Sequence, residues 1–121
     1  MVHEIFDNIR KDYEKIPSMI QLFNVSKIYQ GDVPALEGVT MRITKGEFVF
    51  ITGKSGAGKT TLLRLIFRAE LPSKGSVLVN NFNIARLQRH SIPFLRRNIG
   101  VVFQDFKLLP QKTVFENVAF A

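Results

Sequence analysis

Hydrophobic residues recur with helical spacing at the start of the chain. In residues 4–16, Ile5, Ile9, Tyr13 and Ile16 lie three or four positions apart with charged residues between them. This spacing places them on one face of a helix, so the segment is predicted to form a short amphipathic helix. The Pro-Ser pair that follows is expected to end it.

From Met19 onward the pattern changes to short runs of β-forming residues separated by turns. The run at residues 48–51 reads Phe-Val-Phe-Ile, which is typical of a parallel strand buried on both faces. Turns are predicted at residues 31–34 and 45–46, which contain Gly or Pro. Strands are predicted at residues 20–25, 39–43, 48–51, 76–79 and 99–103.

Two helices are predicted between and after these strands. The first follows a glycine-rich segment at residues 53–58 and is expected to end at residues 71–75, Leu-Pro-Ser-Lys-Gly. Its apolar side is expected to contain Leu62, Leu63, Ile66 and Phe67. The second begins after Thr113, a predicted N-cap that forms a capping box with Glu116, and runs to the last residue, Ala121.

The composition is that of a globular chain without thiol chemistry. Of 121 residues, 45% are hydrophobic and 22% are charged, and there is no Cys. No apolar run approaches the roughly 18 residues that a membrane-spanning helix needs, and the N-terminus lacks the apolar region of a secretory signal. We therefore expect an intracellular protein of one domain or less.

The chain is basic, and its charge is unevenly distributed. Lys and Arg number 17 against 10 Asp and Glu, for a formal net charge of +7. Such an excess favours nucleic acid, an anionic membrane surface or a phosphorylated small molecule as partner. Residues 1–18 hold three basic and four acidic residues, whereas the stretch from Lys54 to Arg97 holds nine basic residues and only Glu70. This stretch is the expected location of a positively charged site.

A phosphate-binding motif follows the apolar run at residues 48–51. Its glycines allow the backbone to curl so that successive N–H groups point at phosphate oxygens, and the following helix adds the positive end of its dipole. A glycine-rich turn with a surface lysine is the alternative, but the predicted strand before it and helix after it favour the phosphate site. The residues fit G-x-x-x-x-G-K-T: Gly53, Lys54, Ser55, Gly56, Ala57, Gly58, Lys59 and Thr60.

The motif predicts binding of a nucleoside triphosphate with Mg²⁺. Lys59 is expected to contact the β- and γ-phosphates, the Thr60 hydroxyl to bind Mg²⁺, and Thr61 to donate a hydrogen bond to the α-phosphate. Tyr29 precedes the motif by 24 residues and offers a ring for stacking on the base, although a Tyr after a strand is more often a packing residue. Gln104 follows the strand predicted at residues 99–103, where α/β sheets place ligand contacts, and is equally well explained as a loop residue.

Together these residues make residues 19–121 resemble the first half of an ABC-type ATPase. Tyr29 matches the aromatic residue of the family's A-loop, residues 53–60 match its Walker A motif, and Gln104 matches its Q-loop. The resemblance implies an α/β P-loop NTPase fold of ABC type, here truncated to an antiparallel β subdomain and the first part of the parallel core sheet. It also implies ATP and Mg²⁺ as cofactors, with Lys59 and Gln104 in catalytic positions and Thr60 and Gln104 as metal ligands.

Residues 91–109, SIPFLRRNIGVVFQDFKLL, resemble most the branch of this family that acts in bacterial cell division. That branch implies three things: an FtsX-type integral membrane partner, a second ATPase subunit that joins on ATP binding, and a cytoplasmic location on the inner face of the plasma membrane. The ATPases of lipoprotein-releasing and macrolide-exporting transporters share much of the segment and remain alternatives.

Two departures from the family pattern are relevant to function. Residues 1–18 precede the usual start of such ATPases, and an upstream start-site assignment or a regulatory helix explains them equally well. The signature motif, the Walker B carboxylates, the D-loop and the switch histidine are expected beyond Ala121, so residues 19–121 represent the N-terminal half of an ATP-binding domain. We therefore expect this chain to bind nucleotide weakly and not to hydrolyse it at a meaningful rate.

Other classes of function have weaker support in the sequence. A basic nucleic-acid-binding P-loop protein fits the charge, but the basic residues are not interleaved with aromatic ones and no nucleic-acid-binding motif occurs, so no nucleic-acid partner is expected. A P-loop kinase or GTPase would use residues 53–60 as well, although Tyr29 and residues 100–109 favour the ABC type. A module that only binds the membrane partner is the third alternative.

Overall fold

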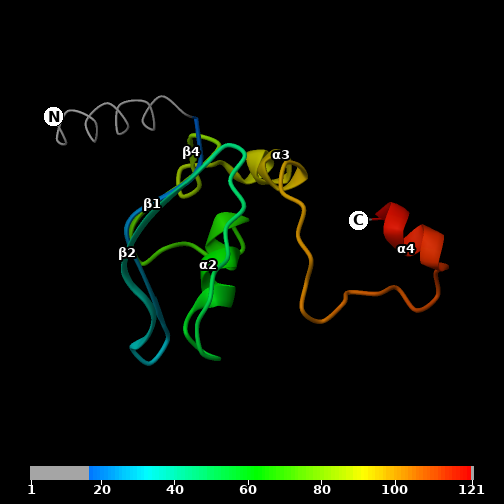
Figure 1. The fold of residues 1–121 in the computed structure, drawn as a ribbon, viewed down its shortest axis with the longest axis horizontal. Coiled ribbons are helices and arrows are strands. Elements are labelled where there is room, and N and C mark those ends of the chain that lie inside the picture. The colour runs from blue at the N-terminus through cyan, green and yellow to red at the C-terminus, as the bar shows by residue number, and fades with distance from the viewer. Residues whose placement is uncertain (1–16, 121) are drawn as a thin grey trace, which may run out of the picture.

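The computed structural model describes residues 17–120, so the helix predicted at residues 4–16 lies outside the described residues. Figure 1 shows a sheet with one helix beside it, a second helix at one end, and a third helix set apart on a long connection. The elements are β1 (Ser18–Tyr29), β2 (Val33–Thr44), α2 (Lys59–Ile66), β3 (Lys74–Val79), β4 (Phe82–Asn83), a 3₁₀ turn at Arg89–Ser91, α3 (Ile92–Arg97) and α4 (Val114–Phe120).

The four strands form one antiparallel sheet in the order β2-β1-β3-β4. Gly31 and Asp32 turn the chain between β1 and β2 with φ values of 81° and 55°. The predicted strands at residues 20–25, 39–43 and 76–79 are confirmed within β1, β2 and β3, and the two-residue strand β4 was not predicted. The antiparallel part of the expected fold is therefore present.

A bulge in β1 sets how closely β3 approaches it. The register shifts between Leu22 and Val25, both of which are fully buried although they lie three positions apart. Asn24 takes a φ of 47° there and donates its backbone N–H to the Thr40 hydroxyl at 3.0 Å. On β3, a Cβ added to Gly75 would lie 2.3 Å from the Asn24 carbonyl oxygen, so only glycine fits at this crossing.

One face of the sheet packs against α2 and forms the core. Leu62 and Ile66 are buried as predicted, but Leu63 is 50% exposed and Leu65 is fully buried. Positions 62, 65 and 66 share a helix face at three- and four-residue spacing, whereas position 63 lies outside it. The core residues are Leu22, Val25, Leu36, Leu62, Leu65, Ile66, Val77, Val79, Ile84 and Leu95.

The helix α2 also ends earlier than predicted. It stops at Ile66 rather than at residues 71–75, and Arg68 just beyond it has a left-handed φ of 62°. The Ala69 N–H then donates to the Arg64 carbonyl at 2.8 Å. A left-handed residue that closes such a bond is a common helix stop, here without the usual glycine.

The predictions of strands at residues 48–51 and 99–103 are wrong for this structure. Neither segment is a strand, and Phe48, Phe50 and Val102 are 85%, 81% and 99% exposed. A parallel strand exists only when neighbouring strands supply its hydrogen bonds, and no described strand pairs with either segment. Without those neighbours the apolar composition alone does not produce a strand.

The last helix, α4, has the capping box that the sequence predicts. The Thr113 N–H donates to Glu116 Oε2 at 2.8 Å, and the Glu116 N–H donates to the Thr113 hydroxyl at 3.2 Å. These bonds, with a smaller contribution from Lys112, lower the pKa of Glu116. No residue of α4 is buried, so these local bonds are its main support.

We expect the start of α4 to fray in acid. The pKa of Glu116 is lowered in the folded helix, so ionised Glu116 stabilises the helix. This stabilisation is complete above the ordinary Glu pKa of about 4.3 and is lost as the pH falls through the lowered pKa. Amide signals of residues 113–116 should therefore shift toward coil values at acid pH. Thr113→Ala should cause the shift already at pH 7, whereas Gln111→Ala should not; equal spectra for both variants would contradict the capping box.

Candidate nucleotide-binding site

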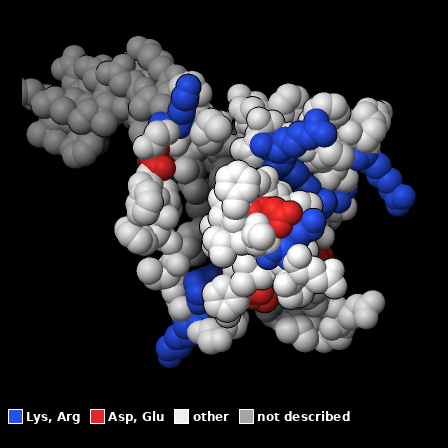
Figure 2. Space-filling model, turned by 90° about the vertical axis from the view of Figure 1, so that its right-hand side faces the viewer, with Lys and Arg blue, Asp and Glu red and all other residues white. Residues whose placement is uncertain are grey.

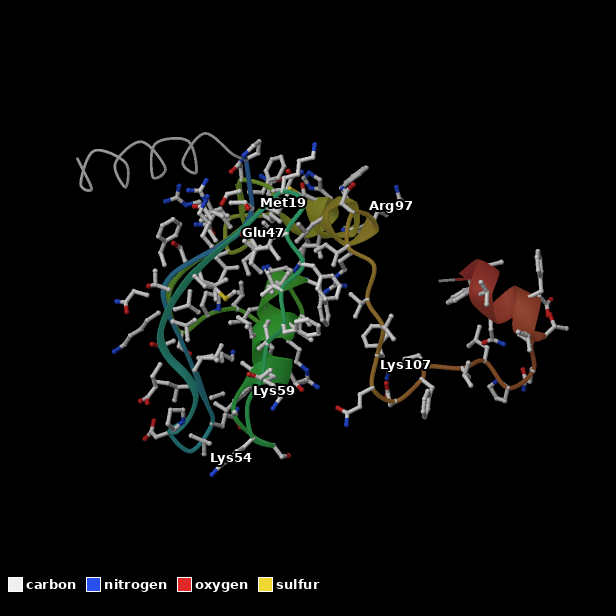
Figure 3. All side chains as sticks on the ribbon, in the orientation of Figure 1. Met19, Glu47, Lys54, Lys59, Arg97 and Lys107 are labelled. Atoms are coloured by element: carbon white, nitrogen blue, oxygen red, sulfur yellow. The ribbon has the colours of Figure 1, made fainter. Side chains whose placement is uncertain are left out.

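The glycine-rich loop at residues 53–58 connects the extended segment at residues 48–52 to α2. Gly56 and Gly58 take left-handed φ values of 78° and 91°, and the Ala57 N–H closes a turn onto the Lys54 carbonyl at 3.1 Å. Figure 3 shows Lys54 and Lys59 at the end of the molecule where α2 begins. Most of the loop is exposed, and a Cβ added to Gly56 would meet no atom within 4 Å. The loop is therefore open to solvent.

Gly58 fixes the loop against the sheet. It is the N-cap of α2, and its carbonyl accepts the Leu62 N–H at 2.9 Å. A Cβ at this position would lie 2.2 Å from the Ala35 carbonyl oxygen and 2.8 Å from the Leu36 side chain, both on β2. The glycine is thus required by the packing against β2 as well as by its backbone angle.

The Lys59 ammonium group lies across the loop. Its Nζ donates to the carbonyl oxygens of Gly53 and Lys54 at 2.6 and 2.7 Å. The first turn of α2 carries neither an acidic residue nor a side-chain cap, so its N–H groups and its positive dipole end are uncompensated. An open loop with a cation and free N–H groups suits a phosphate, and the exposed Thr60 hydroxyl at the same turn is an oxygen ligand of the kind that Mg²⁺ accepts.

Tyr29, at the end of β1, contacts the first turn of α2. Its hydroxyl lies 3.2 Å from Thr61 Oγ1, and Thr61 is buried. The Lys27 Nζ lies 5.1 Å from the centre of the Tyr29 ring and is also paired with Glu70 at 3.0 Å. The structure therefore brings Tyr29 to Thr61, the residue directly after the motif, and this contact was not predicted.

Gln104 is not joined to the loop by any hydrogen bond within the described part of the chain. It lies in an exposed turn, and the adjacent Phe103 ring packs edge-on against Phe67 with ring centres 6.2 Å apart. Phe67 follows the C-terminal end of α2, whereas the loop lies at its N-terminal end. Next to Gln104, the pKa of Asp105 is lowered by a hydrogen bond from Lys107. The joint metal site of Thr60 and Gln104 stays a prediction.

Part of the positive charge between Lys54 and Arg97 supports the fold. Arg68 Nε donates to the Ile84 carbonyl at 2.8 Å, and Arg96 donates to the carbonyls of Phe67 and Arg68 at 3.1 Å each. Sequence reasoning missed these bonds, because nothing in the pattern separates a structural arginine from a ligand-binding one. On the side of the molecule that Figure 2 draws, Lys and Arg lie in several separate groups.

Residues 17–120 contain neither a candidate membrane-spanning helix nor a candidate metal-binding cluster. No helix in this part of the chain has the length and apolar character needed to cross a membrane. No group of three or more His, Cys, Asp or Glu side chains there is arranged to hold a metal ion.

A glycine-rich loop followed by a helix is typical of proteins that bind nucleotides through a phosphate-binding loop. Comparison with known proteins identifies the family. The ABC transporter family matches residues 36–121, and the chain belongs to this family. The chain is similar to the cell division ATP-binding protein FtsE of several bacteria. It is 54% identical to that of Bacillus subtilis, over 85% of this chain and 45% of the relative, and 50% identical to that of Escherichia coli, over 84% and 46%.

Solved structures of the family support the fold. The ATP-binding cassette MJ0796, in a dimeric post-hydrolysis state bound to ADP and Pi, matches with a TM-score of 0.76 and 40% identity, over 83% of this chain and 45% of that one. CbiO1 of Clostridium perfringens matches with a TM-score of 0.76 and 33% identity, over 86% and 41%. The chain thus spans slightly less than half the length of the relatives it matches, and the α/β fold of ABC type is confirmed for that part.

Proposed function

We propose that this chain supplies the nucleotide-binding loop of an FtsE-type ATPase that acts in bacterial cell division. One observation carries the proposal: Lys59 lies over an open glycine loop at an uncapped helix N-terminus, in a chain about 50% identical to FtsE proteins. The ligand is ATP with Mg²⁺. Bound Mg²⁺ would offset phosphate charge, and Thr60 is the residue that would hold it.

Each residue of the motif has a defined task in this proposal. The backbone N–H groups of the loop and of the first turn of α2 bind phosphate oxygens, and the Lys59 ammonium group turns from its two carbonyl acceptors toward the β- and γ-phosphates. Thr61 binds the α-phosphate with the hydroxyl that now contacts Tyr29. The Tyr29 ring stacks on the adenine, and Gln104 responds to the γ-phosphate from the segment after residue 103.

The partners and the location follow from the proposed family role. An FtsX-type integral membrane protein would hold the ATPase at the inner face of the plasma membrane, and exposed apolar residues after Gln104 such as Phe106 and Leu108, 81% and 69% exposed, suit that contact. A second ATPase subunit completes the site, in keeping with the dimeric state of MJ0796. The chain would in this way couple ATP to the membrane partner.

Paired substitutions of Tyr29 test the identity of the nucleotide. We expect Tyr29→Ala to weaken MgATP binding about 10-fold or more, because base stacking on an aromatic ring is worth about 1–3 kcal/mol. Tyr29→Phe keeps the ring and loses only the hydroxyl contact with Thr61, so its affinity should stay within about 3-fold of the wild type. The measurement is equilibrium displacement of a fluorescent adenine nucleotide.

Two outcomes of this assay would contradict ATP binding with Tyr29 stacked on the adenine. Strict preference for GTP over ATP would assign the loop to a different P-loop class. Equal losses for Tyr29→Phe and Tyr29→Ala would show that the hydroxyl contact, and not stacking, is what binding needs. Far-UV circular dichroism of both variants serves as the folding control.

A further inference from the structure

An apolar groove lies beside α3, at the end of the sheet opposite the glycine-rich loop at residues 53–58. Its volume is about 710 Å³. Phe82 and Phe94 on its sides are 59% and 62% exposed, although both are large apolar residues. We name this hollow the α3 groove, and the lining residues that matter here are Met19, Ile20, Phe82, Phe94, Leu95 and Ile99.

The start of β1 forms part of the wall of the α3 groove. Met19 and Ile20 both line it, although successive strand residues normally point to opposite faces, and the register is irregular between Ser18 and Ile20. The Pro17 carbonyl accepts the Lys45 N–H at 2.9 Å, which ties the beginning of β1 to the end of β2. Residues 1–16 are therefore attached to the chain next to the groove.

Residues 1–16 contain an apolar stripe that matches the apolar lining of the α3 groove. Ile5, Ile9, Tyr13 and Ile16 have the spacing of one helix face. The segment is long enough for a helix of about 20 Å at 1.5 Å per residue, because it spans residues 4–16. We propose that residues 4–16 fold back as an amphipathic helix and occupy the α3 groove with this stripe.

The charges at the groove favour this occupant. Residues 1–18 carry four acidic and three basic residues, whereas the rest of the chain is strongly basic. Arg97 lies beside the groove, with its Cζ 5.5 Å from the centre of the Phe94 ring, and forms no ion pair with any residue in the range 17–120. Figure 3 places Met19 and Arg97 at the same end of the molecule. Asp12 lies three positions after Ile9 and four before Ile16, so in a helix it would lie beside the stripe and offer a carboxylate of charge opposite to that of Arg97.

Cross-linking tests the occupant directly, because the chain contains no Cys and introduced thiols are the only ones present. The test variant carries Ile9→Cys and Phe94→Cys. The matched control carries Asn8→Cys and Phe94→Cys, which moves one thiol off the stripe. We expect a disulfide within one chain at least about 10-fold faster in the test variant than in the control, under mild oxidation. Equal rates, or a disulfide only between two chains, would overturn the proposal, the latter by placing a second copy in the groove.

Thiol reactivity gives a second measurement that needs no cross-link. Phe94 is 62% exposed, so Phe94→Cys removes little packing. The rate of maleimide labelling of this thiol should be about 10-fold lower in the chain of 121 residues than in the same variant without residues 1–16. Equal labelling rates would overturn the proposal, and the circular dichroism spectra of both proteins report whether the sheet is intact.

Discussion

Replacing Lys59 with alanine should lower the affinity of the chain for MgATP by about 100-fold. The Lys59 ammonium group has only backbone carbonyl partners in the described structure, so it can turn to a phosphate without breaking an ion pair. A hydrogen bond between charged groups is worth about 1.5–3 kcal/mol, and loss of two such bonds to phosphate oxygens accounts for a 100-fold effect. Isothermal titration with MgATP measures it.

Lys54→Ala is the matched control for this prediction. Lys54 belongs to the same loop and carries the same charge, but its contribution to the contacts described above is its carbonyl oxygen, which the substitution leaves in place. We expect its affinity to stay within about 3-fold of the wild type. Equal losses for the two lysines would mean that the loop attracts phosphate by general charge and not by a placed ammonium group.

Gly58→Ala should lower the free energy of unfolding by about 2–5 kcal/mol. A left-handed φ of 91° in a residue with a Cβ costs about 1–2 kcal/mol. Displacing the Ala35 carbonyl, which lies 2.2 Å from the added Cβ, costs a further 1–3 kcal/mol by the usual cost of overpacking. The free energy of unfolding of a native domain is about 5–15 kcal/mol, so the variant should be largely unfolded in moderate urea.

Gly56→Ala separates the two causes. Gly56 has a similar φ of 78°, but an added Cβ there would meet no atom within 4 Å. Its cost should therefore be the backbone term alone, about 1–2 kcal/mol. Urea unfolding followed by circular dichroism measures both variants, and equal midpoints would contradict the packing of the loop against β2.

Features set by neighbouring residues could be predicted from the sequence. The glycine-rich loop at residues 53–58, the helix after it and the Thr113–Glu116 capping box depend on residues a few positions apart, and the structure contains all three. The strands predicted at residues 48–51 and 99–103 depend on partners elsewhere in the chain, and the described residues supply none. The bulge at Asn24 was missed for the same reason, because it lies against Gly75 in β3, a strand that is distant along the chain.

The candidate site shows the same limit. The sequence offered Tyr29 as a ring for stacking on the base, and the structure brings its hydroxyl to Thr61 in the first turn of α2. It did not indicate that Thr61 is the partner, because the two residues are 32 positions apart. Gln104 depends on a segment whose described anchor is the contact between Phe103 and Phe67, at the far end of α2 from the loop. Long-range packing therefore decides which predicted residues meet.

The most direct test of the central claim is amide chemical-shift mapping of the isotopically labelled chain during titration with MgATP. We expect the largest shifts in residues 53–61, at the glycine-rich loop and the first turn of α2, with smaller shifts at Tyr29. Saturable shifts that leave residues 53–61 unchanged, or no saturable shifts in a folded chain at millimolar MgATP, would contradict it.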